Sequence, residues 1–110
     1  TRANSAFGDL ATVGPTVTVP VAGIYNVNGH VSSYNVGSSA TRCGISVGGS
    51  APTHDRFCET VAGNSADSRQ GLQQITAAAN DTVKMQYCTD GSGTGHWRSR
   101  VMEVLPVRVG

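Results

Sequence analysis

Apolar and polar residues alternate along several short stretches of the chain. Between residues 25 and 32, Tyr25, Val27 and Val31 occupy one face. The opposite face carries Asn26, Asn28, His30 and Ser32. Similar alternation is found in 16–21, 42–47, 82–87 and 101–105. A period of two is typical of a β-strand that buries one face, so each stretch is predicted to be a strand.

Glycine, proline and asparagine cluster between these stretches, and such clusters favour turns. They occur at 13–15, 22–23, 35–39, 48–52, 63–65, 80–81 and 90–95. The segment 70–79 is less clear, because Leu72 and Ile75 fit a helical turn and an irregular strand equally well. About eight short strands separated by frequent turns predict a single all-β domain over residues 1–110, an antiparallel sandwich or barrel.

Composition supports this prediction and narrows the function. The chain has 110 residues, of which 28 are Val, Ile or Thr, and only 14% are charged. The formal charge of +1 is too small for an electrostatic nucleic-acid binder. No apolar run is long enough to span a membrane as a helix, and the residues from Thr1 onward show no signal-peptide pattern. We therefore expect that the protein neither binds nucleic acid nor inserts into a membrane. Thr1 is compatible both with removal of an initiator Met and with cleavage of a leader.

Several segments follow one another in a recognisable order. They begin with Pro, Gly and Tyr in 20–27 and continue through the strand 41–47. Further segments are Arg56-Phe57-Cys58-Glu59-Thr60, Gly71-Leu72, 81–85 and Val104-Leu105-Pro106. In this order and spacing they resemble the tumour-necrosis-factor-like and complement globular-head jelly rolls. The final strand departs from the family pattern, since Arg100-Val101-Met102 lacks the usual Gly-aromatic pair. Lean jelly rolls rich in Gly, Thr and Val are common among bacteriophage and bacterial surface proteins.

The resemblance implies an all-β antiparallel jelly-roll sandwich of about eight short strands that forms a homotrimer. It implies a non-enzymatic role on a virion surface, as a capsid decoration protein or fibre head domain. The partners would then be further copies of the chain and a capsid or other virion protein. The alternative is a secreted, extracellular, lectin-like domain that binds carbohydrate or protein, and a small extracellular enzyme is a more distant third.

No catalytic, cofactor or metal site is predicted. The three histidines are His30, His54 and His96, and no serine stands in a Gly-x-Ser-x-Gly motif. The acidic residues Asp9, Asp55, Glu59, Asp67, Asp81, Asp90 and Glu103 are spread along the chain. The loop 90–96 offers several oxygen atoms that could bind a metal ion, but it has a single carboxylate, which is too few for a typical calcium site. We expect His30 to be a surface or subunit-interface residue.

Trp97, Arg98 and Arg100 form the one aromatic and basic cluster, and we predict a partner contact there. Arginine beside an aromatic residue is common at interface hot spots. Since the two arginines are two residues apart, they are expected to leave the same face of a strand. The solvated edge of a sheet is the alternative interpretation of this cluster.

Three cysteines allow at most one intrachain disulfide. Cys43 and Cys58 are placed symmetrically about the turn 48–52, so a hairpin would bring them opposite each other, and the family resemblance indicates the same pair. A Cys43–Cys88 bridge and no bridge at all remain open. Cys88 has the parity of Lys84 and Gln86, which predicts that it faces away from the core.

Overall fold

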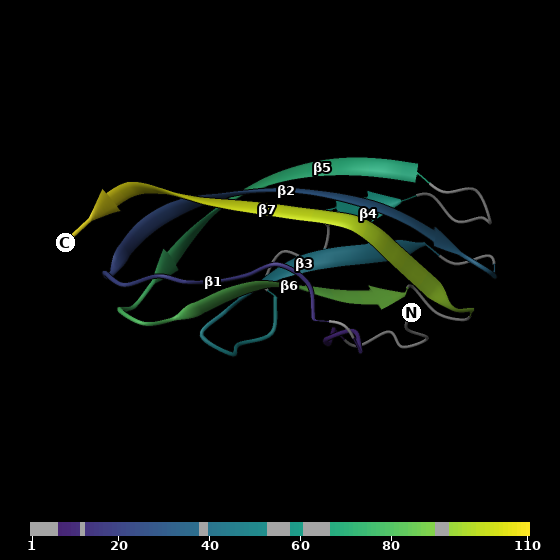
Figure 1. Cartoon of the computed structure of the whole chain (residues 1–110), viewed down its shortest axis with the longest axis horizontal. Coiled ribbons are helices and arrows are strands. Elements are labelled where there is room, and N and C mark those ends of the chain that lie inside the picture. The colour runs from purple at the N-terminus through teal and green to yellow at the C-terminus, as the bar shows by residue number, and fades with distance from the viewer. Residues whose placement is uncertain (1–6, 12, 38–39, 53–57, 61–66, 90–92) are drawn as a thin grey trace.

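The protein folds into two antiparallel β-sheets that pack face to face (Figure 1). The computed structural model describes residues 7–11, 13–37, 40–52, 58–60, 67–89 and 93–110. Within these ranges the strands are β1 (Thr16–Thr18), β2 (Gly23–Asn35), β3 (Thr41–Val47), β4 (Cys58–Thr60), β5 (Asp67–Ala77), β6 (Thr82–Thr89) and β7 (Gly95–Val109). The described part of the chain contains no helix. The predicted all-β, antiparallel, two-sheet architecture is confirmed.

One sheet has four strands in the order β1-β6-β3-β4, and the other has three in the order β5-β2-β7. Strands that are adjacent in a sheet are mostly distant in sequence, and only β3 and β4 form a consecutive pair. The layered body measures 45 × 21 × 21 Å along its principal axes. The long strands β2 and β7 run along the longest dimension, and the C-terminal end of β7 projects at one tip (Figure 1).

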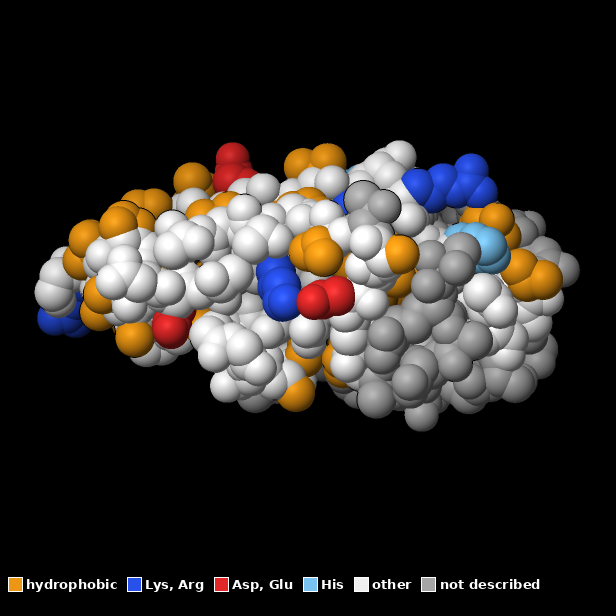
Figure 2. Space-filling model, turned by 60° about the horizontal axis from the view of Figure 1, so that its bottom comes forward, with side chains coloured by type: hydrophobic (Ala, Val, Ile, Leu, Met, Phe, Trp, Pro, Cys, Tyr) orange, Lys and Arg blue, Asp and Glu red, His pale blue; other side chains and the backbone are white. Residues whose placement is uncertain are grey.

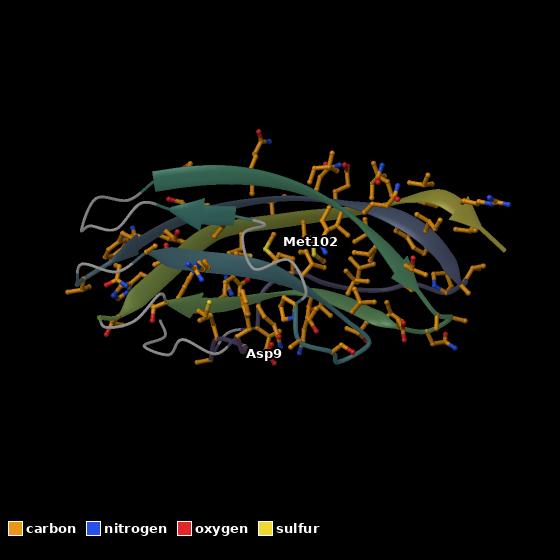
Figure 3. The ribbon with its side chains drawn as sticks, turned by 180° about the vertical axis from the view of Figure 1, so that it is seen from behind. Asp9 and Met102 are labelled. Carbon is orange, nitrogen blue, oxygen red and sulfur yellow. The ribbon has the colours of Figure 1, made fainter. Side chains whose placement is uncertain are left out.

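The alternation predicted from the sequence sets which side chains enter the core. In β2 the odd-numbered residues from Tyr25 to Asn35 are buried, and the even-numbered ones are half-buried. In β6, Val83, Met85 and Tyr87 point inward. The buried apolar cluster consists of Leu10, Val19, Tyr25, Val27, Val31, Cys43, Ile45, Ile75, Ala77, Val83, Met85, Tyr87 and Trp97. Met102 and Val104 of β7 pack against it from the facing sheet (Figure 3).

The ambiguous segment 70–79 is a strand for most of its length. It forms β5, which pairs with β2 in register from Gly23↔Ala77 to Ser33↔Asp67. Gly71 lies opposite Gly29 in this ladder, so neither strand carries a side chain at that position. The turn that follows ends the strand, with Asn80 in the left-handed region at φ 69°. Asp81 caps this turn by accepting a hydrogen bond from the Ala78 amide over 2.8 Å.

The outer face of the four-stranded sheet is partly covered by chain segments rather than by a third layer. A Cβ on Gly44 would lie 2.5 Å from the Pro52 Cβ and 3.2 Å from the ring of Phe7. Gly44 is therefore required for the turn after β3 and the N-terminal segment to cross the sheet closely. Residues 7–10 form no strand, although Gly8 makes an isolated bridge to Tyr87. Beside this bridge, Asp9 forms an ion pair of 2.9 Å with Lys84 on the same sheet (Figure 3).

Strand β7 contains a bulge that changes which of its side chains face the core. Its register with β2 shifts between His30 and Ser32, where Ser99 adopts a φ of 52°. A bulge adds one residue to a strand and so reverses which side chains face the core. On one side of the bulge Trp97 points inward, and on the other side Met102 and Val104 do so.

Candidate functional site

The outer face of the three-stranded sheet exposes large apolar side chains. Leu72 of β5 is 65% exposed, Val101 of β7 is 60% exposed, and Leu105 of β7 is 45% exposed. They flank Asn26, Asn28 and His30, the outward-facing side chains of β2. Val107 and Val109 are also exposed near the end of β7, beyond a second register shift between Ile24 and Tyr25. Figure 2 shows hydrophobic side chains gathered at this C-terminal tip of the molecule. We call Leu72, Val101 and Leu105 the apolar face.

A shallow hollow of about 550 Å³ lies on the same side of this sheet. It is lined by Asn28, Gly29, His30, Gln70, Gly71, Leu72, Val101 and Glu103. Asn28 donates a hydrogen bond of 3.3 Å to the Glu103 carboxylate, and His30 Nδ1 lies 3.3 Å from the Ser99 carbonyl oxygen. His30 is thus a surface residue of the sheet, as predicted. The lining contains no serine, threonine or cysteine that could act as a nucleophile beside His30.

A second group of side chains lies at the other end of the same sheet, where β2 and β7 pair near Tyr34. The rings of Tyr34 and His96 stack with their centroids 4.5 Å apart and their planes 6° apart. The guanidinium carbon of Arg98 lies 5.0 Å from the centroid of the Tyr34 ring. Figure 2 shows basic, imidazole and hydrophobic side chains together at this tip.

The predicted cluster of Trp97, Arg98 and Arg100 is divided between two sides of β7. Trp97 is 7% exposed and packs at a tilt against Tyr87 in the core, so it offers almost no surface to a partner. Arg98 is exposed on the outer face. Arg100 turns toward the other sheet, and its Nη1 donates a hydrogen bond of 3.3 Å to the Tyr87 hydroxyl. The prediction that both arginines leave the same face is wrong, because the bulge at Ser99 reverses the alternation between them.

Tyr87 is the side chain whose titration the fold changes most clearly. Its ring is fully buried, and the Arg100 guanidinium lies 5.4 Å from its centroid. Burial raises the pKa of Tyr87 to about 12, and the hydrogen bond from Arg100 opposes that rise. The hydroxyl therefore stays protonated at neutral pH and acts as a structural hydrogen-bond partner.

The register of β3 and β4 places Cys43 directly opposite Cys58, as the symmetric hairpin predicted. The side chain of Cys58 lies outside the described residues, so the Cys43–Cys58 disulfide stays a prediction. Cys43 and Cys88 are both buried, and the described residues contain no disulfide. Cys43 pairs with Tyr87 and Cys88 with Arg42, so the two cysteines lie on opposite faces of the sheet, which disfavours the rival pairing. Cys88 lies opposite Arg42 and thus faces away from the core side of β6, yet it is buried.

The remaining candidate residues do not form a site among the described parts of the chain. Asp81 is a turn residue and Glu103 faces outward, as expected. Phe57, His54, Asp55, Asp90 and the side chains of Glu59 and Asp67 lie outside the described residues. Within the described residues, no three His, Cys, Asp or Glu side chains gather closely enough to hold a metal ion. None of these residues forms a helix that could cross a membrane.

The geometry thus offers two surfaces for binding, the apolar face and the tip around Tyr34, and both belong to the three-stranded sheet. A comparison of the chain with protein-family models and with known proteins found no match to either.

Proposed function

We propose that this chain is a non-enzymatic structural and binding module that works as a homotrimer on the surface of a virus particle. A capsid decoration protein is the form that we favour, and the head domain of a fibre is the related possibility. A single observation carries the proposal: Leu72, Val101 and Leu105 are exposed together on the outer face of the three-stranded sheet. Large apolar side chains exposed on one face of a small protein are typical of an interaction site. Here the polar outward-facing side chains of β2 lie between them.

The strand order supports the jelly-roll part of the proposal. The chain passes between the two sheets after β1, β2, β4, β5 and β6. Repeated crossing between two antiparallel sheets is typical of jelly rolls, which combine two Greek keys in a double sheet. The family resemblance of residues 16–106 favours the same topology and favours three copies as the assembled form.

Self-association through the apolar face has a simple physical basis. Folding of a chain of this size leaves a thin core, so burial between copies adds apolar contact that the single domain lacks. The outward-facing side chains of β2 between the apolar residues are neutral amides and an imidazole. Among the described side chains, the one carboxylate on this face is that of Glu103 in β7, and it accepts a hydrogen bond from Asn28. Neutral polar groups can hydrogen-bond across an interface at a lower desolvation cost than charged groups.

Sedimentation equilibrium tests this proposal directly. The wild-type protein is expected to have three times the single-chain mass of 11.3 kDa. The double variant Leu72→Gln with Val101→Thr is expected to weaken association by about tenfold or more, because it removes apolar surface from the interface centre. The matched control is Val36→Thr, at a valine that is 57% exposed beyond the end of β2.

Two results would count against the proposal. A wild-type protein that stays monomeric while keeping its full β circular dichroism would rule out the trimer. A trimer that the double variant leaves unchanged would move the interface away from the apolar face. Co-purification with capsids from the source particle would support the decoration role, which sedimentation alone does not address.

The lectin-like alternative has less support, because sugar binding commonly uses exposed aromatic rings. Tyr25, Tyr87 and Trp97 are all buried in the core. Tyr34 remains on the surface, but two neighbouring side chains already contact its ring.

A further inference from the structure

The tip of the three-stranded sheet brings together a tyrosine, a histidine and an arginine from two strands. In the pairing of β2 with β7, Tyr34 lies opposite His96 and Ser32 lies opposite Arg98. All four side chains are on the outer face, since Ser33 and Trp97 between them point into the core. Because Ser32 is small, it leaves space in which the Arg98 side chain can lean over the Tyr34 ring.

The contact with Tyr34 leaves the hydrogen-bonding edge of Arg98 available. A guanidinium over an aromatic ring covers its apolar face and directs its N–H groups outward. Arg98 is exposed and forms no ion pair with any acidic side chain that the structure describes. Its guanidinium is also held in position by the ring, so it loses less conformational entropy when it binds a ligand.

The surroundings of Arg98 are polar and partly apolar. His96 provides a further ring N–H donor next to the Tyr34 ring. Val36, which is 57% exposed, follows β2 at this tip and its amide bonds to the Thr94 carbonyl over 2.9 Å. No described acidic side chain contributes to the group. A binding partner that matches these features has a carboxylate and an adjacent apolar side chain.

We propose that Arg98, positioned by Tyr34 and flanked by His96, binds a carboxylate of an acidic protein segment. A planar guanidinium binds a carboxylate through two parallel hydrogen bonds, which is a specific and strong arrangement. An acidic peptide fits better than an acidic sugar, because the Tyr34 ring is already in contact with two side chains and has little surface left for a pyranose. The inference rests on the proposed function for the existence of a protein partner, and it is independent of the trimer.

Fluorescence anisotropy with a labelled, end-capped peptide of alternating Glu and Leu tests the site. The same peptide with Gln in place of Glu is the control probe, and we expect it to bind about tenfold more weakly or worse. Arg98→Gln should reduce binding of the acidic peptide to the level of the control probe. Arg98→Lys should recover only part of the loss, because an ammonium group cannot make the two-bond contact.

Two further variants separate a specific site from general positive charge. Tyr34→Leu keeps Arg98 but removes its support, and should weaken binding several-fold. Arg108→Gln removes an exposed arginine at the opposite end of β7 and should leave binding unchanged. Equal loss from Arg98→Gln and Arg108→Gln would show that only overall charge matters, and would overturn the proposal.

Other outcomes are equally decisive. Equal binding of the Glu and Gln peptides would overturn the site as a carboxylate receptor. Binding of an oligogalacturonate that depends on Arg98, without binding of the acidic peptide, would assign the site to acidic sugars instead. Sedimentation of the same samples reports assembly separately, so a monomeric protein that binds the peptide would contradict the trimer and not this site.

Discussion

Tyr87 shows how one buried hydroxyl makes stability depend on pH. Its pKa is raised to about 12 in the folded protein, whereas a tyrosine in the unfolded chain titrates near 10. Between these values the unfolded state loses its proton first, so the free energy of unfolding falls as pH rises. We expect the stabilisation to be complete below pH 10 and to decrease by about 1–2 kcal/mol as the pH approaches 12.

Urea unfolding of the wild type and of Tyr87→Phe over this pH range measures the effect. Phenylalanine keeps the ring in the core but cannot ionise, so the variant should lose less stability than the wild type between pH 9 and pH 11.5. The comparison of slopes removes the contributions of the other tyrosines and of Lys84, which both proteins share. Parallel curves would show that Tyr87 does not titrate differently in the folded state.

At the scale of the element, the bulge in β7 determines which side chains form the core and which form the surface. Ser99 has a φ of 52° there, a conformation that suits glycine and disfavours β-branched residues. Ser99→Val is therefore expected to destabilise the fold by about 1–2 kcal/mol. Ser99→Gly should be tolerated at little cost. Chemical denaturation of both variants provides the measurement.

The two variants also test whether the bulge itself is present. A regular strand at this position would accept valine at least as well as glycine, because valine has the higher strand propensity. Stability in the order Val above Gly would therefore contradict the bulge. It would also contradict the separation of Arg98 from Arg100.

The same bulge explains why the candidate site could be predicted only in part. The alternation in 101–105 sets Met102 and Val104 on one face of the strand, and both pack against the core. Continued back along a regular strand, the same parity would turn Arg98 and Arg100 inward and Trp97 outward. A bulge arises from pairing with β2, which is distant in sequence, and Ser99 carries no local signal such as glycine. The sequence predicts a partner contact at all three residues, but only Arg98 is exposed on the outer face, while Trp97 and Arg100 turn inward.

Strand β5 and the hairpin after β3 differ in how far their local sequence determines their structure. Residues 70–79 have a weak local pattern, and their strand conformation comes from the long ladder with β2. The turn 48–52, in contrast, can be predicted from its own residues, because it contains Gly48 and Gly49, which both adopt positive φ. That local signal was enough to predict that Cys43 lies opposite Cys58.

At the scale of the whole molecule, the two-sheet sandwich follows from the sequence, but the role of its outer faces does not. A period of two identifies the two sides of a strand without showing which exposed side a partner covers. Leu72 and Val101 became recognisable as one surface only when β5 and β7 were placed on either side of β2. The Tyr34 and Arg98 contact likewise depends on a pairing between residues far apart in the chain.

The strand order also predicts slow folding. Apart from β3 with β4, the pairs that build the sheets join distant segments, such as β1 with β6 and β2 with β7. Distant pairings require long loops to close before stabilising contacts form, and sandwiches of this kind fold in about milliseconds to seconds. Stopped-flow refolding monitored by Trp97 fluorescence is expected to give relaxation times in this range, and completion within microseconds would contradict the topology.

The position of β7 has a consequence for synthesis on the ribosome. Residues 95–109 form the partner of the central strand β2 and carry Trp97, Met102 and Val104 to the core. A nascent chain that ends before residue 95 can form neither the three-stranded sheet nor the closed core, although β1 to β6 are already present. Residues 95–109 must therefore leave the ribosome before this domain can fold, and until then its apolar strands are exposed to aggregation.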